Sequence, residues 1–449
     1  MPPKKNMEEN TLIDDPIDTI TFQDIKHLVY YDESNNKYWA FLDNKWSSYN
    51  VDRFKEIAHE EWFWRLRPRT KDGEEQSPMS CMMGHISRVN RISGTVCLPH
   101  DKREIVVFGG KKYLNDSTFE LLEAKEGDWG LIKEFFMKRF EPEQMDALFS
   151  WIKVYLDSCR RGEPRPGHAL WIGGHKCRGK NFLTTFILGR MFGGYRDGTD
   201  LLLNGAQFTA DLLSSPILTA NDARPSDNKQ RHSFTNRVKS FIANPEKSFH
   251  KKFGASVCIE SHVRLVCTMN LDVESIGLLP NINDGDHDSM KDKVMFLKMN
   301  ETSPALKIDP REAWGIYGDA LKAFVWYLEN EFVIPESLAG APRFGCRSYQ
   351  HADLLQESKQ LSNEHNVEDA LVGWWGGENL KTAKFYSTFD LIKGIAETTG
   401  STFYKNCSPT ALSRMIIKAQ QAGGLKWVTR YKTKYERGWL IESPPKLDD

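Results

Sequence analysis

The sequence lacks a long apolar segment and an excess of charge of either sign. No run of 18 apolar residues occurs in the 449-residue chain, so no segment is long enough for a membrane-spanning helix. Residues 1–6 have no apolar core of the kind found in a secretory signal peptide. Lysine and arginine number 60, against 61 aspartates and glutamates. Any contact with a polyanion must therefore come from a local basic cluster.

The sequence also lacks the spacings of common metal and disulfide frameworks. Its eight cysteines are scattered, with no Cys-x-x-Cys pair, which argues against a zinc ribbon and a disulfide scaffold. The twelve histidines form no i, i+4 pair with a third ligand nearby. We expect a soluble protein of a reducing compartment, with no membrane contact and no metal other than Mg²⁺.

What the sequence does contain is a glycine-bounded basic loop, GHKCRGKN, at residues 174–181. The apolar run 168–172 precedes it, and a predicted helix, 182–188, follows it. Strand, glycine-bounded loop, Gly-Lys and helix is the layout of a phosphate-binding P-loop, in which backbone N–H groups and the helix N-terminus face the phosphates. We predict an ATP site made by the following residues: Gly174, His175, Lys176, Cys177, Arg178, Gly179, Lys180, Asn181 and Phe182.

Three positions of this loop set its chemistry. Lys180 is expected to reach the β- and γ-phosphates. Asn181 stands where Ser or Thr normally coordinates Mg²⁺, and its neutral amide is a weaker ligand. Cys177 is open to two interpretations, a reactive thiol or an inert buried residue.

Two apolar strands downstream end in polar residues. Residues 216–222 end in Asn221 and Asp222, and residues 263–270 end in Asn270. In P-loop ATPases a second, acidic strand holds Mg²⁺ and orients the attacking water. We therefore predict Asp222 as the catalytic carboxylate and, together with Asn181, as a metal ligand. The amide of Asn270 can position water or sense the nucleotide.

Two further segments suit nucleic-acid phosphates. The aromatic-flanked turn 249–254 carries His250, Lys251 and Lys252. Near the end of the chain, where basic residues outnumber acidic ones, a predicted helix 408–415 carries Arg414, and a hairpin interleaves cations with tyrosines. Its cations are Arg430, Lys432, Lys434 and Arg437. The alternative for this hairpin is a solvated surface that contacts a neighbouring subunit.

The order of predicted elements defines the fold class. Apolar strands alternate with helices over residues 165–305, which predicts an α/β fold with a mostly parallel, helix-covered sheet. The last 75 residues read helix, helix, β-hairpin, the order of a winged helix. We divide the chain into a disordered start (1–15), a small α+β N-terminal domain (16–125), a helical linker or collar (126–165), a P-loop ATPase domain (166–335), a helical connector (336–375) and a winged-helix domain (376–449).

In order and spacing, these motifs resemble the superfamily 3 helicases. This AAA+-related group is typified by the primase–helicases of phages, plasmids and large DNA viruses, and its members place a P-loop, an acidic strand, a basic β-hairpin and a strand ending in Asn within one short domain. The stretches 190–194, 278–280 and 343–345 resemble the phage-type subgroup. The resemblance covers about residues 130–445. The first 125 residues hold no recognisable primase site.

The resemblance implies a homo-oligomeric ring, usually a hexamer, that binds ATP between subunits and moves along single-stranded or forked DNA. It also implies a role in replication in a bacterial cytoplasm, with any primase or polymerase on a separate chain. The family's arginine finger follows the Asn-ended strand, where this chain offers Lys291 and Lys293. Lysine is a point charge rather than a fork, so Arg264 and Arg343 are further candidates for the cation that reaches a neighbouring subunit.

Two departures from the family pattern leave two functions open. With Asn181 in the loop and Asn221 beside Asp222, one Mg²⁺-binding hydroxyl and one carboxylate are absent. Water-positioning groups commonly contribute about 10²–10⁴-fold in rate, so slow hydrolysis is the alternative to the efficient hydrolysis that a helicase needs. The first function is an ATP-dependent ring helicase, and the alternative is a nucleotide-gated DNA-binding oligomer for origin recognition or loading. A third, more remote option is a ring ATPase that acts on RNA or in defence.

Overall fold

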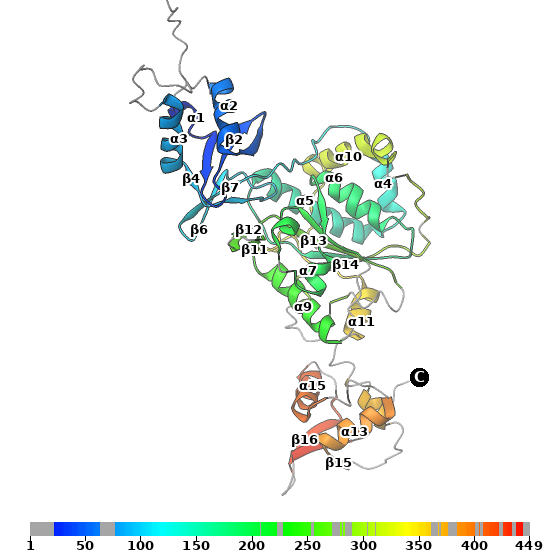
Figure 1. Cartoon of the computed structure of the whole chain (residues 1–449). Coiled ribbons are helices and arrows are strands. Elements are labelled where there is room, and N and C mark those ends of the chain that lie inside the picture. The colour runs from blue at the N-terminus through cyan, green and yellow to red at the C-terminus, as the bar shows by residue number, and fades with distance from the viewer. Residues whose placement is uncertain are drawn as a thin grey trace, which may run out of the picture. The chain divides into compact units, whose positions relative to one another are not determined.

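The computed structural model (Figure 1) describes most of the chain between Phe22 and Glu442. The described residues are 22–62, 77–206, 208–221, 228–252, 256–271, 279–280, 282, 290–302, 304–309, 311–360, 367, 370–375, 384–399, 404, 407–421, 425–432 and 437–442. The predicted disordered start, 1–15, lies outside them, as do Asp222 and Lys434. Among the described residues, no helix is long and apolar enough to cross a bilayer.

The chain forms two compact units. One runs to Thr118 apart from Pro99–Asp101, and the other begins at Phe119. The first unit has two sheets, of strand order β3-β2-β1-β4 and β5-β7-β6. Their bounds are β1 Val29–Asp32, β2 Lys37–Leu42, β3 Lys45–Tyr49, β4 Arg91–Ile92, β5 Thr95–Val96, β6 Ile105–Phe108 and β7 Lys111–Asn115.

The described residues of the first unit also form the helices α1 (Phe22–Ile25), α2 (Val51–Trp62) and α3 (Pro78–Val89). Phe54 of α2 stacks on Tyr38 at 4.3 Å between ring centroids, and both side chains are buried. Tyr30 lies on β1 and Tyr38 on β2, and α2 begins at Val51. The helix α3 was missed, although Ser77 caps it by accepting a hydrogen bond from the Ser80 N–H at 3.2 Å.

The second unit opens with two helices, α4 (Gly130–Met137) and α5 (Pro142–Arg161), which confirm the predicted helical segment. The later helix α10 (Ala313–Asn330) packs against both. Their shared interface is aromatic, because Phe149 lies 5.0 Å from both Phe136 and Phe324 between ring centroids. These rings form part of the main hydrophobic core.

The centre of the second unit is a five-stranded sheet of order β14-β8-β13-β10-β9, in which every neighbouring pair is parallel. This confirms the predicted α/β fold with a parallel sheet. The strands are β8 Ala169–Gly173, β9 Tyr195–Asp197, β10 Ile217–Asn221, β13 Arg264–Met269 and β14 Val294–Lys298. The edge strand β9 was missed because its three residues are exposed and carry no apolar run.

The connections between these strands diverge at one point. The chain leaves β8 through η1 (Phe182–Leu188) and α6 (Gly189–Met191) toward β9 at one edge of the sheet, whereas it leaves β13 toward β14 at the other edge. In parallel sheets, ligands bind beyond the carboxyl ends of strands where such connections diverge. The topology therefore places a candidate crevice beyond the ends of β8 and β13.

The remaining connections add helices and a hairpin. Between β9 and β10 lie α7 (Thr199–Leu203) and α8 (Ala210–Leu213). Between β10 and β13 lie α9 (Asn228–Ala243) and an antiparallel hairpin. The hairpin strands are β11 Glu246–His250 and β12 Ser256–Glu260.

The last part of the chain contains α11 (Ala352–Gln360) and then a small sheet of order β15-β17-β16, beside which α13 and α15 are described. Helix, helix and hairpin follow one another as predicted, and β15 adds a third antiparallel strand. A side chain at Gly438 would meet the Tyr386 carbonyl at 2.2 Å, so the pairing requires glycine there. The elements are β15 Lys384–Ser387, α13 Thr388–Thr399, α15 Pro409–Gln421, β16 Val428–Lys432 and β17 Arg437–Ile441.

Candidate functional site

The loop 174–180 leaves the carboxyl end of β8 and turns sharply before η1. Its first N–H, on Gly174, donates to the Met269 carbonyl of β13 at 3.2 Å. Cys177 and Gly179 both adopt positive φ, 62° and 94°, and such left-handed residues in a loop turn successive N–H groups into an anion-binding concavity. A Cβ at Gly179 would lie 3.0 Å from the Phe135 ring, so the loop needs glycine at this position.

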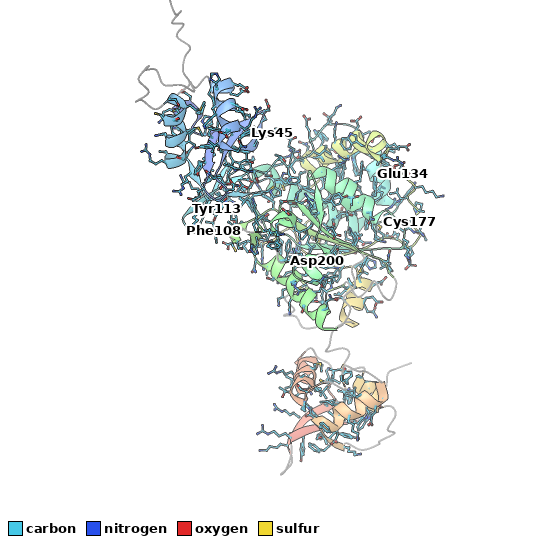
Figure 2. All side chains as sticks on the ribbon, in the orientation of Figure 1. Lys45, Phe108, Tyr113, Glu134, Cys177 and Asp200 are labelled. Carbon is cyan, nitrogen blue, oxygen red and sulfur yellow. The ribbon has the colours of Figure 1, made fainter. Side chains whose placement is uncertain are left out.

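Cys177 is exposed on the loop and is labelled in Figure 2. Its interpretation as an inert buried residue is therefore wrong. The cause is the left-handed turn, since it places residues 175–177 on the surface of the loop. The Cys177 carbonyl is nevertheless fixed, because it accepts the Leu306 N–H at 2.9 Å.

Arg139, which follows α4, braces the loop from behind. Its Nε donates to the Arg178 carbonyl at 2.7 Å, and its Nη1 and Nη2 donate to the carbonyls of Phe135 and Pro304 at 3.1 and 3.4 Å. The side chain is 3% exposed, and burial lowers the pKa of its guanidinium from the ordinary value. No sequence motif marks Arg139, so sequence reasoning missed it.

Lys180 and Asn270 meet at the carboxyl edge of the sheet. The Lys180 ammonium donates to the Gly174 and His175 carbonyls at 2.6 and 2.9 Å and to Asn270 Oδ1 at 2.8 Å. The contact follows from topology, because β8 and β13 are parallel neighbours with Gly173 opposite Met269. Two residues that are 90 positions apart in sequence therefore lie in direct contact.

Asn221 lies at the same edge, at the end of β10. Its side-chain Oδ1 accepts a hydrogen bond from Thr268 Oγ1 of β13 at 2.7 Å, so this amide links two strands just before they end. Asp222, the predicted carboxylate, lies outside the described residues. The predicted Mg²⁺ ligand pair of Asn181 and Asp222 stays a prediction.

A cavity of about 1080 Å³ opens between the loop, η1 and Asn270. Drug-sized ligands occupy pockets of roughly 300–1,000 Å³, so a nucleoside triphosphate fits. Four of its lining residues are cationic, Lys176, Arg178, Lys180 and Arg190, and no carboxylate is among those described. The Nε atom of Arg178 is buried and has no hydrogen-bond partner among the described residues. The cavity therefore favours a polyanion.

The helix η1 that follows the loop is wound as a π-helix, a rare form that occurs frequently at functional sites. Thr185 Oγ1 donates to the Asn181 carbonyl at 2.7 Å. Phe182 and Phe186 stack at 4.7 Å between centroids and contribute an aromatic wall to the cavity. A cation, Arg190, lines the same cavity one turn further on.

The candidate trans cations lie away from this cavity. Lys293 immediately precedes β14, at the amino edge of the sheet, where its ammonium pairs with Asp292 at 3.0 Å and is 6% exposed. Arg264 begins β13 at the same edge and is 4% exposed, so burial within its own chain disfavours it, as it does Lys293, as a cation that reaches a neighbouring subunit. Arg343 is exposed and donates to the Ala243 carbonyl at 2.7 Å. The roles of Lys293, Arg264 and Arg343 stay predictions.

The basic residues predicted to bind nucleic acid lie on two hairpins. Lys251 and Lys252 are exposed just after β11, and the preceding His250 is half-buried, with its N–H bonded to Thr209 Oγ1 at 3.0 Å. An antiparallel hairpin carries them, as the resemblance implies. In the last part of the chain, the described cations of the second group are all exposed: Arg414 on α15, Arg430 and Lys432 on β16, and Arg437 on β17.

The fold and the site together define a class: a mixed α/β protein with a five-stranded parallel sheet and a cationic loop at its carboxyl edge. No family model and no curated protein matches the chain. Solved structures do match. The apo structure of the NrS-1 C-terminal region (residues 305–718) has 16% sequence identity and a TM-score of 0.57, over 92% of this chain and 95% of that chain.

A second structure, the A form of the same apo NrS-1 region, has 16% identity and a TM-score of 0.56, over 93% of this chain and 96% of that chain. At this identity the similarity concerns the fold alone. Because it extends over nearly the whole length of both chains, it includes the parallel sheet.

Proposed function

We propose that this protein is an ATP-dependent ring helicase that moves on single-stranded DNA and unwinds duplex during the replication of a phage, a plasmid or another mobile element. The observation that carries the proposal is the contact between the Lys180 ammonium and Asn270 Oδ1 at 2.8 Å, beside a cationic cavity of about 1080 Å³. The superfamily 3 resemblance and the shared fold with the NrS-1 C-terminal region support it.

The residues of the loop bind and orient the triphosphate in this proposal. Lys180 exchanges its contacts with the Gly174 and His175 carbonyls for phosphate oxygens, because an ammonium bonds more strongly to an anion than to a neutral carbonyl. Arg139 keeps the loop in its bound shape by holding the Arg178 carbonyl. Asn270 stays within reach of both the ammonium and a water molecule at the end of the triphosphate.

Mg²⁺ belongs to the same proposal. Asn181, which lines the cavity, and Asp222 would hold it. When bound, the ion neutralises charge on the β- and γ-phosphate oxygens. The chain's own contribution is then to fix the position of Asn181, whose carbonyl accepts the Thr185 hydroxyl.

The DNA contacts are assigned to the exposed cations. Lys251 and Lys252 are close to the turn of a hairpin, where two adjacent ammonium groups can follow a phosphodiester backbone inside a ring. Arg430 and Lys432 form an exposed row on β16, suited to the backbone of a duplex. Arg343, being exposed, is better placed than the buried Arg264 and Lys293 to reach ATP on a neighbouring subunit.

The test is ATP turnover by the purified full chain with and without single-stranded DNA. We expect turnover that DNA stimulates, and its loss in Lys180→Ala, by at least about 10²-fold because a preorganised cation at the transferred phosphoryl group is removed. Lys133→Ala, which removes an exposed lysine on α4, is the matched control and should leave turnover unchanged. DNA-stimulated turnover that persists in Lys180→Ala would refute the assignment.

One observation favours the second candidate function, a nucleotide-gated DNA-binding oligomer. The end of β10 offers the Asn221 amide, already engaged by Thr268, where an acidic residue usually stands. If the full chain binds ATP and DNA together but releases no phosphate, the second function replaces the first. Loss of ATP binding as well would exclude both.

A further inference from the structure

A second, much smaller cavity of about 20 Å³ lies at the amino edge of the parallel sheet, the edge opposite the loop 174–180. It is bounded by residues 164–167 before β8, the end of α9, the beginning of β11 and the beginning of β13. The residues that line this cavity are unusual for so small a space, because three of them are basic: Arg165, Lys247 and Arg264.

Arg264 is the most deeply buried of these cations. It is 4% exposed, and its guanidinium lies over the Tyr155 ring at 4.7 Å from the centroid. Its Nη2 atom is buried and has no hydrogen-bond partner among the described residues. The backbone opposite is Gly167, where a Cβ would lie 2.3 Å from Arg264 Nε, so only glycine leaves room for the guanidinium.

Lys247 and Arg165 complete the cationic wall. Lys247 is 9% exposed, and its ammonium donates to the carbonyls of Phe241 and Asn244 at the end of α9. Burial, followed by repulsion from Arg264, lowers the pKa of Lys247 to about 7. Arg165 donates through Nη2 to the Pro342 carbonyl at 2.7 Å. Each side chain thus has neutral partners but no anionic one among these contacts.

The neighbouring titratable groups do not supply the missing negative charge. Burial raises the pKa of the Cys159 and Cys346 thiols to about 12, so both are neutral at pH 7. Burial and the nearby Arg264 lower the pKa of His168 and His262 to about 3, so both are neutral as well. Each imidazole keeps one buried nitrogen without a partner among the described residues.

Among the described residues, no carboxylate lines the cavity, and two carboxylates act on the neighbouring histidines instead. Asp292 pairs with Lys293 at 3.0 Å, and its charge acts to raise the pKa of His168. The charge of Asp101 acts in the same direction on the pKa of His262. Burial is the largest influence on the pKa of the Arg264 guanidinium, which it lowers. The groups that act on this pKa by charge are Tyr155, Cys159, Cys346 and Arg165, and none of them is a carboxylate. An uncompensated buried cation is strongly destabilising, and proteins normally pair it with an anion.

We propose that the amino-edge cavity is a binding site for one small monovalent anion of about the size of chloride, held between Arg264, Lys247 and Arg165. The volume sets the size of the ligand. A water-sized particle needs roughly 10–15 Å³ in this measure, so about 20 Å³ admits one such particle and excludes phosphate. The anion neutralises Arg264 and joins the ends of three elements: α9, β11 and β13.

The position of the site gives the anion a structural task. Lys247 is the second residue of the hairpin strand β11, and Ser261, which follows β12, also lines the cavity. A bound anion therefore fixes the base of the hairpin that presents Lys251 and Lys252. The site itself does not depend on the proposed helicase function, because it needs neither ATP nor DNA.

The first experiment follows thermal unfolding of the full chain at constant ionic strength and constant sodium. Chloride, bromide and formate are compared with gluconate, which is too large for the cavity. Binding to the folded state alone raises the midpoint, and we expect about 2 °C with each small anion. Equal midpoints in chloride and gluconate would overturn the proposal.

Variants localise the effect. Arg264→Met keeps the length of the side chain and removes the charge, and it should abolish the chloride dependence and lower the midpoint in chloride. If no anion binds, the same change removes an unpaired buried charge and the midpoint rises instead, which overturns the proposal. Should Arg264→Met not fold, Arg165→Gln, at the edge of the cavity, should raise the half-saturating chloride concentration at least about tenfold.

Arg237→Gln is the matched control for Arg165→Gln. Arg237 also donates to main-chain carbonyls, those of Leu202 and Leu203, but it does not line the cavity. Its substitution should leave the chloride dependence unchanged, and a tenfold weakening there would overturn the localisation.

A bromide derivative supplies the direct view. Crystals of the full chain grown in bromide should show one anomalous peak within hydrogen-bond distance of Arg264. Absence of a peak overturns the proposal. A peak without any thermal shift in bromide identifies an adventitious ion only and overturns it too.

Discussion

The two edges of the parallel sheet carry the same sign of charge in opposite settings. At the carboxyl edge, cations of the loop 174–180 line an open cavity of about 1080 Å³, and the left-handed residues Cys177 and Gly179 shape the backbone around it. At the amino edge, Arg264 and Lys247 are buried around about 20 Å³. Access and volume, rather than charge, distinguish the two sites.

The difference in volume and access between the two cavities suits them to different tasks. The large cationic cavity has room for a polyanion such as a nucleotide, whereas the small one has room only for a small anion. The hairpin of β11 and β12 begins beside the small cavity. In the proposed function, the carboxyl edge binds the nucleotide, and the amino edge anchors the hairpin that is proposed to contact DNA.

The largest expected effect tests whether the hairpin and the carboxyl-edge cavity have separate roles. Changing Lys251→Ala together with Lys252→Ala removes two exposed cations that do not line the cavity. Affinity for an ATP analogue should stay within about twofold, while unwinding of a forked duplex should be abolished, because the proposed contacts of these cations with DNA phosphates are lost. Fluorescence unwinding and nucleotide titration measure the two quantities. Unchanged unwinding would show that the hairpin assignment is wrong.

The next effect tests the shape of the carboxyl-edge loop. Gly179→Ala forces a Cβ onto a residue with φ of 94° and to 3.0 Å from the Phe135 ring. We expect at least about tenfold weaker binding of an ATP analogue, because the strained loop no longer presents its N–H groups together. Calorimetric titration gives the affinity.

The control for Gly179→Ala is Gly84→Ala in α3, where a Cβ meets nothing within 4 Å. That change should leave nucleotide affinity unaltered and slightly stabilise the helix. Equal affinities for the Gly179 and Gly84 variants would contradict the role of the loop.

The effect on nucleotide binding is expected to be smaller at Asn270 than at Gly179. Replacing it with alanine removes the Oδ1 atom that accepts from the Lys180 ammonium at 2.8 Å. Turnover should fall by about 10²-fold, with binding of the ATP analogue within about threefold, since the amide acts mainly on water and on the lysine. Steady-state ATPase assays measure this, with Asn330→Ala as the control, because that amide bonds only within its own helix at Trp326. A fall in binding as large as the fall in turnover would assign Asn270 to binding instead.

The smallest effect concerns pH and the amino edge. The pKa of Lys247 falls from 10.5 to about 7 on folding, so between these values the unfolded chain binds more protons than the folded chain. The free energy of unfolding should therefore rise from pH 7 toward pH 10, by at most about 1.4 kcal/mol per pH unit. This contribution is complete above the unfolded pKa and is lost as pH falls through the folded pKa.

Denaturant unfolding in gluconate at several pH values measures this slope. Lys247→Met should remove it, and chloride should reduce it in the unchanged chain, since a bound anion favours the charged ammonium. A slope that is the same in Lys247→Met would show that another group is responsible.

Much of the carboxyl edge could be predicted from the sequence. Two local patterns can be recognised without knowledge of the tertiary structure. One is an apolar run followed by Gly-x4-Gly-Lys, and the other is an apolar run that ends in Asn270. Parallel pairing of β8 and β13 then brings Lys180 to Asn270, because both strands end at the same edge. The structure also contains the predicted strand that ends in Asn221, because this strand too is a short apolar run that can be recognised locally.

The rest depends on burial and on contacts between distant segments, which carry no local pattern. Arg139 acts on the loop from a distant segment, the turn after α4, and its role is visible only in its three hydrogen bonds to carbonyls. The sequence left Arg264 as a surface candidate, whereas the structure buries it over Tyr155. The exposure of Cys177 depends on its left-handed φ, which no neighbour in the sequence requires.

The most direct measurement is a calorimetric titration of the full chain with a non-hydrolysable ATP analogue, repeated with Lys180→Ala. The account predicts one site per chain with a dissociation constant in the micromolar range, and binding in Lys180→Ala weaker by at least about 10²-fold. No binding by the unchanged chain, or equal binding by Lys180→Ala, would contradict the claim that the carboxyl-edge cavity is a nucleotide site.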